Sequence, residues 1–158
     1  MSIVFYRVDE RAVHGQTVVA WSKVYPVDGI ILVSDHIAGD TLLRKIYSNA
    51  AFGTPVHVFD EKTAARKLVE AENSAKKYMV IAQDVSTFSN LIEAGSITPE
   101  KINIGPMAKK DDRKSVTMGI YLNEAEMSIC KKINDLNIDI EFQLLPESDA
   151  KKFKNLRV

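Results

Sequence analysis

Short apolar segments alternate with helical patterns along almost the whole chain, and this alternation is the feature that most constrains the fold. Six segments rich in β-branched and aromatic residues are typical of strands: 2–8, 28–34, 54–59, 77–82, 101–105 and 138–145. A further short strand is expected around 115–120. Continuous apolar runs of this length suit strands covered on both faces, as in a parallel sheet.

Helical patterns lie between these strands, at 16–25, 39–50, 61–71, 86–94 and 127–136. Asp40 or a neighbour is expected to cap the second of them and Asp60 the third, and Asn123 with Glu126 resembles a capping box before the last. This order predicts βαβ crossovers and an open, mostly parallel α/β sheet with helices on both faces. No repeat or linker interrupts the pattern, so residues 1–158 are predicted to form a single domain.

The composition excludes several classes of protein. Lys and Arg number 21 against 21 Asp and Glu, so the chain lacks the basic excess of a general nucleic-acid binder. The single cysteine, Cys130, excludes an internal disulfide, and its amphipathic helical segment predicts a buried structural thiol. No basic leader is present and no apolar run approaches the ~20 residues that span a bilayer, so we expect a cytoplasmic protein.

The first loop carries the strongest chemical signal. In open α/β sheets, ligands bind beyond the carboxyl ends of the strands, and the loop after the first strand lies at such an end. Its polar residues are Asp9, Glu10, Arg11, His14, Gly15, Gln16 and Thr17.

His14 is predicted to face the N-terminus of the following helix, where N–H groups and the helix dipole favour anions. Gly15 is expected to let the backbone turn closely, and Arg11 can offer a bidentate guanidinium to phosphate oxygens. Neutral imidazole is a nucleophile, and a positive field disfavours the protonation that would quench it. The loop therefore favours a covalent phosphohistidine, for which no metal or cofactor is expected. On the residues alone, a hydrogen-bonding or packing role for His14 stays open.

The other two histidines are interpreted as structural. His57 lies inside a strand pattern, which favours a core or edge position, and His36 follows the second strand as a cap-region residue or a rim contact. The chain contains neither G-x-x-x-x-G-K-[ST] nor G-x-G-x-x-G, so no nucleotide-phosphate loop is predicted.

The segment RVDERAVHGQTVVAW strongly resembles the IIB components of the mannose/fructose/sorbose family of the bacterial sugar phosphotransferase system. That family carries R-x-D-x-R-x-x-H-G-Q followed by an apolar helix with a tryptophan. The matching residues are Arg7, Asp9, Arg11, His14, Gly15, Gln16 and Trp21. The resemblance continues through SDHIAGD, LIEAGS, KINIGPM and IDIEFQLLPES, and so covers essentially the whole chain. Pro106 departs from it, because relatives commonly have a second glycine there.

The resemblance implies a mostly parallel sheet of about seven strands and a phosphocarrier function. His14 would accept a phosphoryl group from a IIA protein and pass it to a sugar carried by membrane IIC and IID subunits. The sugar would be mannose, fructose, sorbose or N-acetylgalactosamine in type. The protein would be cytoplasmic and peripherally associated with the membrane complex, and a homo-oligomer is compatible with this function.

Roles for the neighbouring residues follow as hypotheses. Arg11 would neutralise phosphate charge, and Asp9 would position Arg11 or His14 or simply close the loop. Backbone donors would come from Gly15, Gln16 and Thr17. Asp84 and Ser86, after the fourth strand, would either contact phosphate or cap the next helix.

Two rival functions remain possible on the sequence alone, and two basic clusters each have two possible roles. Asp60 follows the third strand and superficially imitates the phosphorylated aspartate of a receiver domain, and a non-catalytic α/β binding module is the other rival. The first cluster edges a docking surface or is a solvated loop; it comprises Lys109, Lys110, Arg113 and Lys114. The second forms a basic tail that approaches an acidic partner or membrane, or is solvated; it comprises Lys151, Lys152, Lys154 and Arg157.

Overall fold

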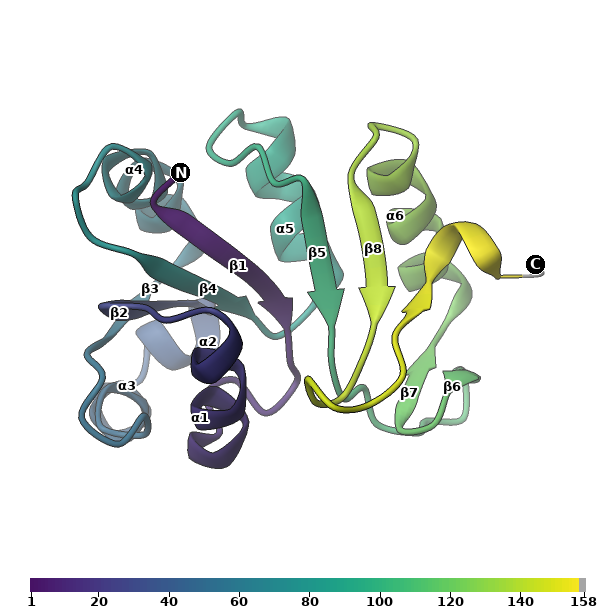
Figure 1. Cartoon of the computed structure of the whole chain (residues 1–158), viewed down its shortest axis with the longest axis horizontal. Coiled ribbons are helices and arrows are strands. Elements are labelled where there is room, and N and C mark those ends of the chain that lie inside the picture. The colour runs from purple at the N-terminus through teal and green to yellow at the C-terminus, as the bar shows by residue number, and fades with distance from the viewer. Residues whose placement is uncertain (157–158) are drawn as a thin grey trace.

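A seven-stranded sheet forms the centre of the fold (Figure 1). In the computed structural model, which describes residues 1–156, its strand order is β3-β2-β4-β1-β5-β8-β9. The strands are β1 (Ile3–Val8), β2 (Gly29–Val33), β3 (Val56–Phe59), β4 (Tyr78–Ala82), β5 (Lys101–Ile104), β8 (Asp139–Phe142) and β9 (Lys151–Lys152). The first six run parallel, and β9 pairs antiparallel with β8. The predicted open, mostly parallel sheet is therefore confirmed.

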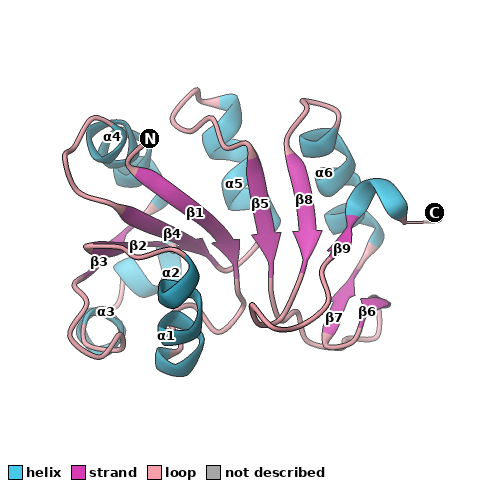
Figure 2. Ribbon diagram, viewed as in Figure 1, coloured by secondary structure: helices cyan, strands magenta, loops and turns pink. Residues whose placement is uncertain are grey.

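Helices cover both faces of this sheet (Figure 2). They are α1 (Gly15–Val24), α2 (Asp35–Ala38), α3 (Thr41–Ser48), α4 (Glu61–Glu72), α5 (Val85–Glu93) and α6 (Glu124–Asn134), with a short 3₁₀ helix, η1 (Phe153–Asn155). Trp21 of α1 and Ile37 of α2 pack in one apolar core, whereas Leu68 of α4, Phe88 of α5 and Ile133 of α6 pack in the other. Successive strand residues alternate between the two cores, as the pleat of a strand requires.

Side-chain caps fix where several helices begin. Asp40 accepts a hydrogen bond from the Leu43 N–H (3.0 Å), which confirms the predicted cap of α3. Asn123 and Glu126 form the predicted capping box. Because Glu126 is its third helical residue, α6 begins at Glu124, three residues before the predicted start at 127.

Two predicted strands differ from the observed ones, and two short elements were not predicted. The strand expected around 115–120 is a hairpin of β6 (Lys114–Thr117) and β7 (Ile120–Leu122), which turns at Gly119 with a φ of 77°. The strand expected over 138–145 ends at Phe142, and α2 and β9 were not predicted at all. Both missed elements are too short, at four and two residues, to show a periodicity.

The remaining structural expectations concern single residues. Cys130 is fully buried in α6, as expected. His57 is exposed on the edge strand β3, with its ring stacked 6.4 Å from Phe59, and His36 is exposed in α2. Within residues 1–156, no helix combines the length and the apolar character needed to cross a membrane.

The strand order places a switch point between β1 and β4. From β1, the chain passes through α1 to β2 on one side, whereas from β4 it passes through α5 to β5 on the other. The loops after β1 and β4 therefore diverge at the carboxyl edge of the sheet. Ligands of open α/β proteins bind at such a point.

Candidate phosphoryl-transfer site

His14 is the residue that joins the first loop to α1. It is the N-cap of the helix, with extended backbone (φ −116°, ψ 117°), and its carbonyl accepts the Val18 N–H at 3.0 Å. Its side chain is exposed and makes no capping hydrogen bond. The imidazole and the first N–H groups of α1 are therefore both available to one ligand. This agrees with the position predicted from the sequence, although the helix begins at Gly15 rather than Gln16.

Asp9 holds the guanidinium of Arg11 in a two-point contact. Arg11 Nε donates to Asp9 Oδ1 (3.2 Å), Arg11 Nη2 donates to Asp9 Oδ2 (3.2 Å), and the same Nη2 donates to Thr17 Oγ1 (3.0 Å). The carboxylate is buried, at 3% exposed, whereas the Arg11 side chain is 43% exposed. Asp9 thus anchors Arg11 from below and leaves one side of the guanidinium in solvent. Of the roles predicted for Asp9, positioning of Arg11 is the one the contacts show.

Asp9 has a second cationic neighbour, Arg7, which is 1% exposed. Arg7 Nε lies 3.6 Å from Asp9 Oδ2, and the two Nη atoms donate to Asn103 Oδ1, the Gln143 carbonyl (3.1 Å) and the Leu144 carbonyl (2.8 Å). Burial lowers the pKa of Arg7 to about 10, although the charge of Asp9 opposes this shift. The carbonyls of the two residues that follow Phe142 at the end of β8 therefore point to a guanidinium, whereas the Gln143 N–H still donates to the Ile104 carbonyl of β5 (2.9 Å).

Arg7 belongs to the sequence motif but had no predicted role, and Asn103 was not among the predicted site residues. The signal was an arginine in an otherwise apolar strand, which needs buried partners. Those partners come from β5 and from the turn after β8, which the tertiary structure brings to Arg7. The space is tight there, because a Cβ added at Gly105 would overlap the Arg7 guanidinium.

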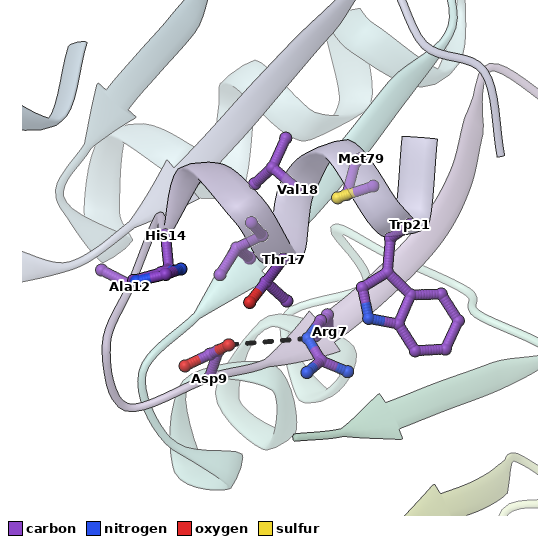
Figure 3. A pocket seen from close by; sticks show the side chains of 9 residues that line it. Arg7, Asp9, Ala12, His14, Thr17, Val18, Trp21 and Met79 are labelled. Carbon is purple, nitrogen blue, oxygen red and sulfur yellow. Dashed lines mark ion pairs between the residues drawn. The ribbon is translucent and has the colours of Figure 1, made fainter. Parts of the chain in front are cut away.

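Figure 3 shows the interior side of this loop, where the Arg7, Asp9 and Thr17 side chains lie beneath α1. Arg7 Cζ lies 5.1 Å from the centre of the Trp21 ring, a cation–π contact. The cavity that the side chains in Figure 3 enclose measures only about 10 Å³. A cavity of this size is too small for a phosphoryl group. The exposed side of His14 is therefore where a phosphoryl group has room.

Gly15 departs from its predicted role. Its φ is not in the left-handed range, and it is the first residue of α1 rather than part of a turn. A Cβ at this position would lie 2.5 Å from Phe52 Cε2 and 3.1 Å from the Ala50 carbonyl oxygen. Gly15 therefore accommodates the segment after α3 against the start of α1, a role the sequence could not reveal.

The loop after β4 supports the site through Gln83. Its amide Nε2 donates to the Glu10 carbonyl (3.0 Å), and its Oε1 accepts from Ser34 Oγ (2.8 Å). Asp84, by contrast, accepts from the Thr87 N–H (2.8 Å) and from Ser86 Oγ (2.8 Å). Of the two predicted roles for Asp84 and Ser86, these contacts match the cap of α5. Gln83 is the contact residue that the sequence did not single out.

Glu10 ties the first loop to a distant segment. Its carboxylate accepts from the buried side chain of Arg113 and from the Ala108 N–H (3.1 Å), and Arg113 also binds Glu126 of the α6 capping box. Arg113, at 6% exposed, is thus neither a docking residue nor a solvated one, which corrects its place in the first basic cluster. The Pro106 carbonyl accepts weakly from the Glu10 N–H (3.4 Å), so this loop still contacts the site.

The second basic cluster is part of the fold at three of its four positions. Lys151 and Lys152 form β9, and Lys154 lies in η1. Lys151 Nζ donates to the Val116 carbonyl of the hairpin (3.1 Å). Arg157 lies outside the described residues.

Asp60, the candidate phosphoacceptor of the rival function, caps α4 by accepting from the Thr63 N–H at 2.6 Å. It follows the edge strand β3, which β2 and β4 separate from β1. Asp60 and Asp9 therefore do not share a site.

Comparison with known proteins identifies the family of this chain. The family model described as "PTS system sorbose subfamily IIB component" matches residues 3–157. The chain is 29% identical to the fructose-specific EIIB component of Bacillus subtilis, over 97% of this chain and 94% of that protein. It is 27% identical to the mannose-specific EIIAB component of Escherichia coli, over 99% of this chain but only 48% of that protein. The crystal structure of manxB from Thermoanaerobacter tengcongensis is 28% identical and superposes with a TM-score of 0.85, covering 96% of this chain and 92% of that one. The chain therefore belongs to the sorbose subfamily of phosphotransferase-system IIB components, and is a phosphotransferase of sugar transport.

Proposed function

We propose that His14 is the phosphoryl carrier of this IIB component. It takes the group from a phosphorylated IIA protein and gives it to a hexose or amino sugar during uptake through membrane IIC and IID subunits. One observation carries the proposal: His14 is an exposed N-cap whose side chain does not cap its own helix, at the switch point of the sheet. A cytoplasmic protein that docks on the membrane complex fits this exchange.

The proposed transfer needs no cofactor, because each N–P or O–P bond that forms replaces an N–P bond that breaks. A lone pair of the His14 imidazole attacks the phosphorus of the donor phosphohistidine, the new N–P bond forms, and the bond to the donor nitrogen breaks. In the second half, the sugar hydroxyl attacks, the His14 N–P bond breaks, and the hydroxyl proton leaves to solvent or base. His14 returns to its starting state.

The groups around His14 suit such a transfer. Backbone N–H groups of Gly15, Gln16 and Thr17 open α1 and favour charge on the phosphoryl oxygens. Arg11, which Asp9 and Thr17 hold in place, adds a half-exposed guanidinium. Preorganised donors of this kind need no rearrangement during the reaction.

The test is phosphoryl transfer from ³²P-labelled IIA of the same transport system to the wild-type chain and to His14→Ala. We expect incorporation into wild type and none into His14→Ala. His36→Ala and His57→Ala are matched controls, because both histidines are exposed and lie elsewhere. Incorporation into His14→Ala would overturn the proposal.

A second measurement separates the rival on Asp60. Phosphohistidine is labile to acid and stable to base, whereas an aspartyl phosphate is labile to base. We expect the label to survive base and to be lost in acid. A base-labile product that persists in His14→Ala and disappears in Asp60→Asn would support the receiver-like function instead.

A further inference from the structure

Phe52 is an exposed aromatic residue held beside the phosphoryl-transfer site. Its side chain is 76% exposed, although phenylalanine is a residue that folding ordinarily buries. A single exposed apolar side chain needs no explanation by itself. Two further observations distinguish Phe52.

The first observation is its backbone. Phe52 has a φ of +46°, and Gly53, which follows it, has a φ of +91°. The Thr54 N–H donates to the Ala51 carbonyl (3.1 Å), so residues 51–54 close a turn with both central residues left-handed. Glycine, asparagine and aspartate dominate such turns, and a bulky residue at positive φ is an outlier. Strain of this kind clusters at functional sites.

The second observation is the place of the ring. The ring tip lies so close to Gly15 that a Cβ there would be 2.5 Å from Phe52 Cε2. Gly15 is bonded to His14. Buried Ala51, at 3% exposed, anchors the turn in the core beneath α1 to α3 and directs Phe52 outward.

A protein that delivers a phosphoryl group to His14 must cover this ring. A standard interface buries about 800 Å² on each partner, which corresponds to a disc of about 16 Å radius. A disc of that size centred on His14 includes Phe52, whose ring lies next to Gly15. Aromatic residues are enriched in such interfaces, and a few anchors carry most of the binding energy.

We propose that Phe52 is a docking anchor for the IIA phosphoryl donor, whose surface offers an apolar pocket beside its own phosphohistidine. This inference rests on the proposed function of His14 and adds a specific contact to it. The donor is favoured as occupant because nitrogen-to-nitrogen transfer brings two protein-held imidazoles together. Both protein surfaces must then meet at His14 and Gly15.

The test compares wild type with Phe52→Ala and Phe52→Gly in transfer from phosphorylated IIA. We expect the KM for phosphorylated IIA to rise about tenfold, with kcat within twofold of wild type. Phe52→Gly also removes the backbone strain, so equal effects of both variants assign the loss to the ring. Phe52→Tyr keeps an aromatic ring and should restore most of the affinity.

Leu136→Ala is the matched control. Leu136 is 54% exposed and lies between α6 and the start of β8, at the opposite edge of the sheet. The Leu136→Ala variant should keep the wild-type KM for phosphorylated IIA. Phosphoramidate, a small phosphoryl donor with no protein surface, should label wild type and Phe52→Ala at equal rates.

Each other outcome counts against the inference in a distinguishable way. If wild type takes no phosphoryl group from IIA, the proposed function fails. If wild type transfers and Phe52→Ala keeps its KM, only the docking role fails. If Phe52→Ala changes only transfer to sugar in membranes, the membrane subunits are the occupant. If it converts a dimer to a monomer in sedimentation while KM is unchanged, the occupant is a second copy.

Discussion

Arg7 Nε lies 3.6 Å from Asp9 Oδ2, with both side chains at most 3% exposed, and this pair underlies the loop that presents His14. The Asp9 carboxylate also binds Arg11, so one buried anion positions two guanidinium groups. One of them is buried among carbonyls and the other is half-exposed near the transfer site. The buried charge of Arg7 is therefore neutralised by Asp9 inside the fold, while the positive charge of Arg11 is presented at the surface.

Replacement of Arg7 should destabilise the whole domain. Arg7→Met removes the donors to Asn103 and to two carbonyls, and leaves Asp9 with Arg11 as its cationic partner. Breaking a buried ion pair costs about 3–5 kcal/mol. Urea denaturation should report a loss of this size in the free energy of unfolding. Arg66→Met, which removes an exposed ion pair with Glu70, should leave the free energy of unfolding close to that of wild type. Equal losses in the two variants would contradict the structural role of Arg7.

Replacement of Arg11 should affect transfer more than stability. Its side chain is 43% exposed, and Asp9 keeps Arg7 when Arg11 is removed. A lost charge-assisted hydrogen bond to the moving phosphoryl group corresponds to about 1.5–3 kcal/mol, or about 10–150-fold in rate. Rapid-quench measurement of transfer to Arg11→Ala should show this decrease, with a thermal midpoint close to wild type. Unchanged kinetics would remove Arg11 from the site.

Arg113 should couple the first loop to the α6 capping box. Its guanidinium binds both Glu10 and Glu126, so Arg113→Met leaves these two carboxylates without their arginine partner. The expected loss is about 2 kcal/mol of unfolding free energy, measured in urea. The exposed pair of Lys131 with Asp135 provides the control, and Lys131→Ala should lose about 0.5 kcal/mol or less. A loss that does not exceed the control would show that the pairing is not stabilising.

Asp60 should make α4 sensitive to acid. The Thr63 N–H holds the pKa of this carboxyl below its usual value. A group whose pKa is lower in the folded state stabilises it above the unfolded pKa of about 3.9, and loses this effect as the pH falls through the folded value. The difference in thermal midpoint between wild type and Asp60→Ala should therefore be full at pH 6 and shrink below pH 4. A difference that stays constant with pH would contradict the charged cap.

Cys130 should be unreactive in the folded protein. Burial raises the pKa of its thiol to about 12, so almost no thiolate is present at pH 8. A disulfide reagent such as Ellman's should label no thiol in the native chain and one thiol in urea. Rapid labelling without denaturant would contradict the packing of α6.

The parts of the site that the sequence predicted are local. His14 follows the first strand within six residues and precedes the helix directly, so strand and helix patterns alone placed it at a helix start. The caps at Asp40, Asp60 and Asn123 were predictable for the same reason, because each contact spans three residues. The resemblance to the family added the reaction.

Contacts between distant segments could not be predicted. Arg7 meets Asn103 across 96 positions, and Glu10 meets Arg113 across 103. No periodicity encodes such pairs, because they depend on which strands become neighbours and how the loops pack. Gly15 shows the same limit, since its close neighbour Phe52 comes from the segment after α3.

The class of fold, the caps of the helices and the position of His14 could be predicted from local sequence, because short-range periodicity and capping chemistry act within a few residues. By contrast, the contacts of Asp9 with two arginines, the burial of the Arg113 side chain and the packing of Phe52 on Gly15 arise from long-range packing. The reason is physical: burial changes the energy of a charge or a ring by several kcal/mol. That burial exists only once the strands have assembled in the order β3-β2-β4-β1-β5-β8-β9.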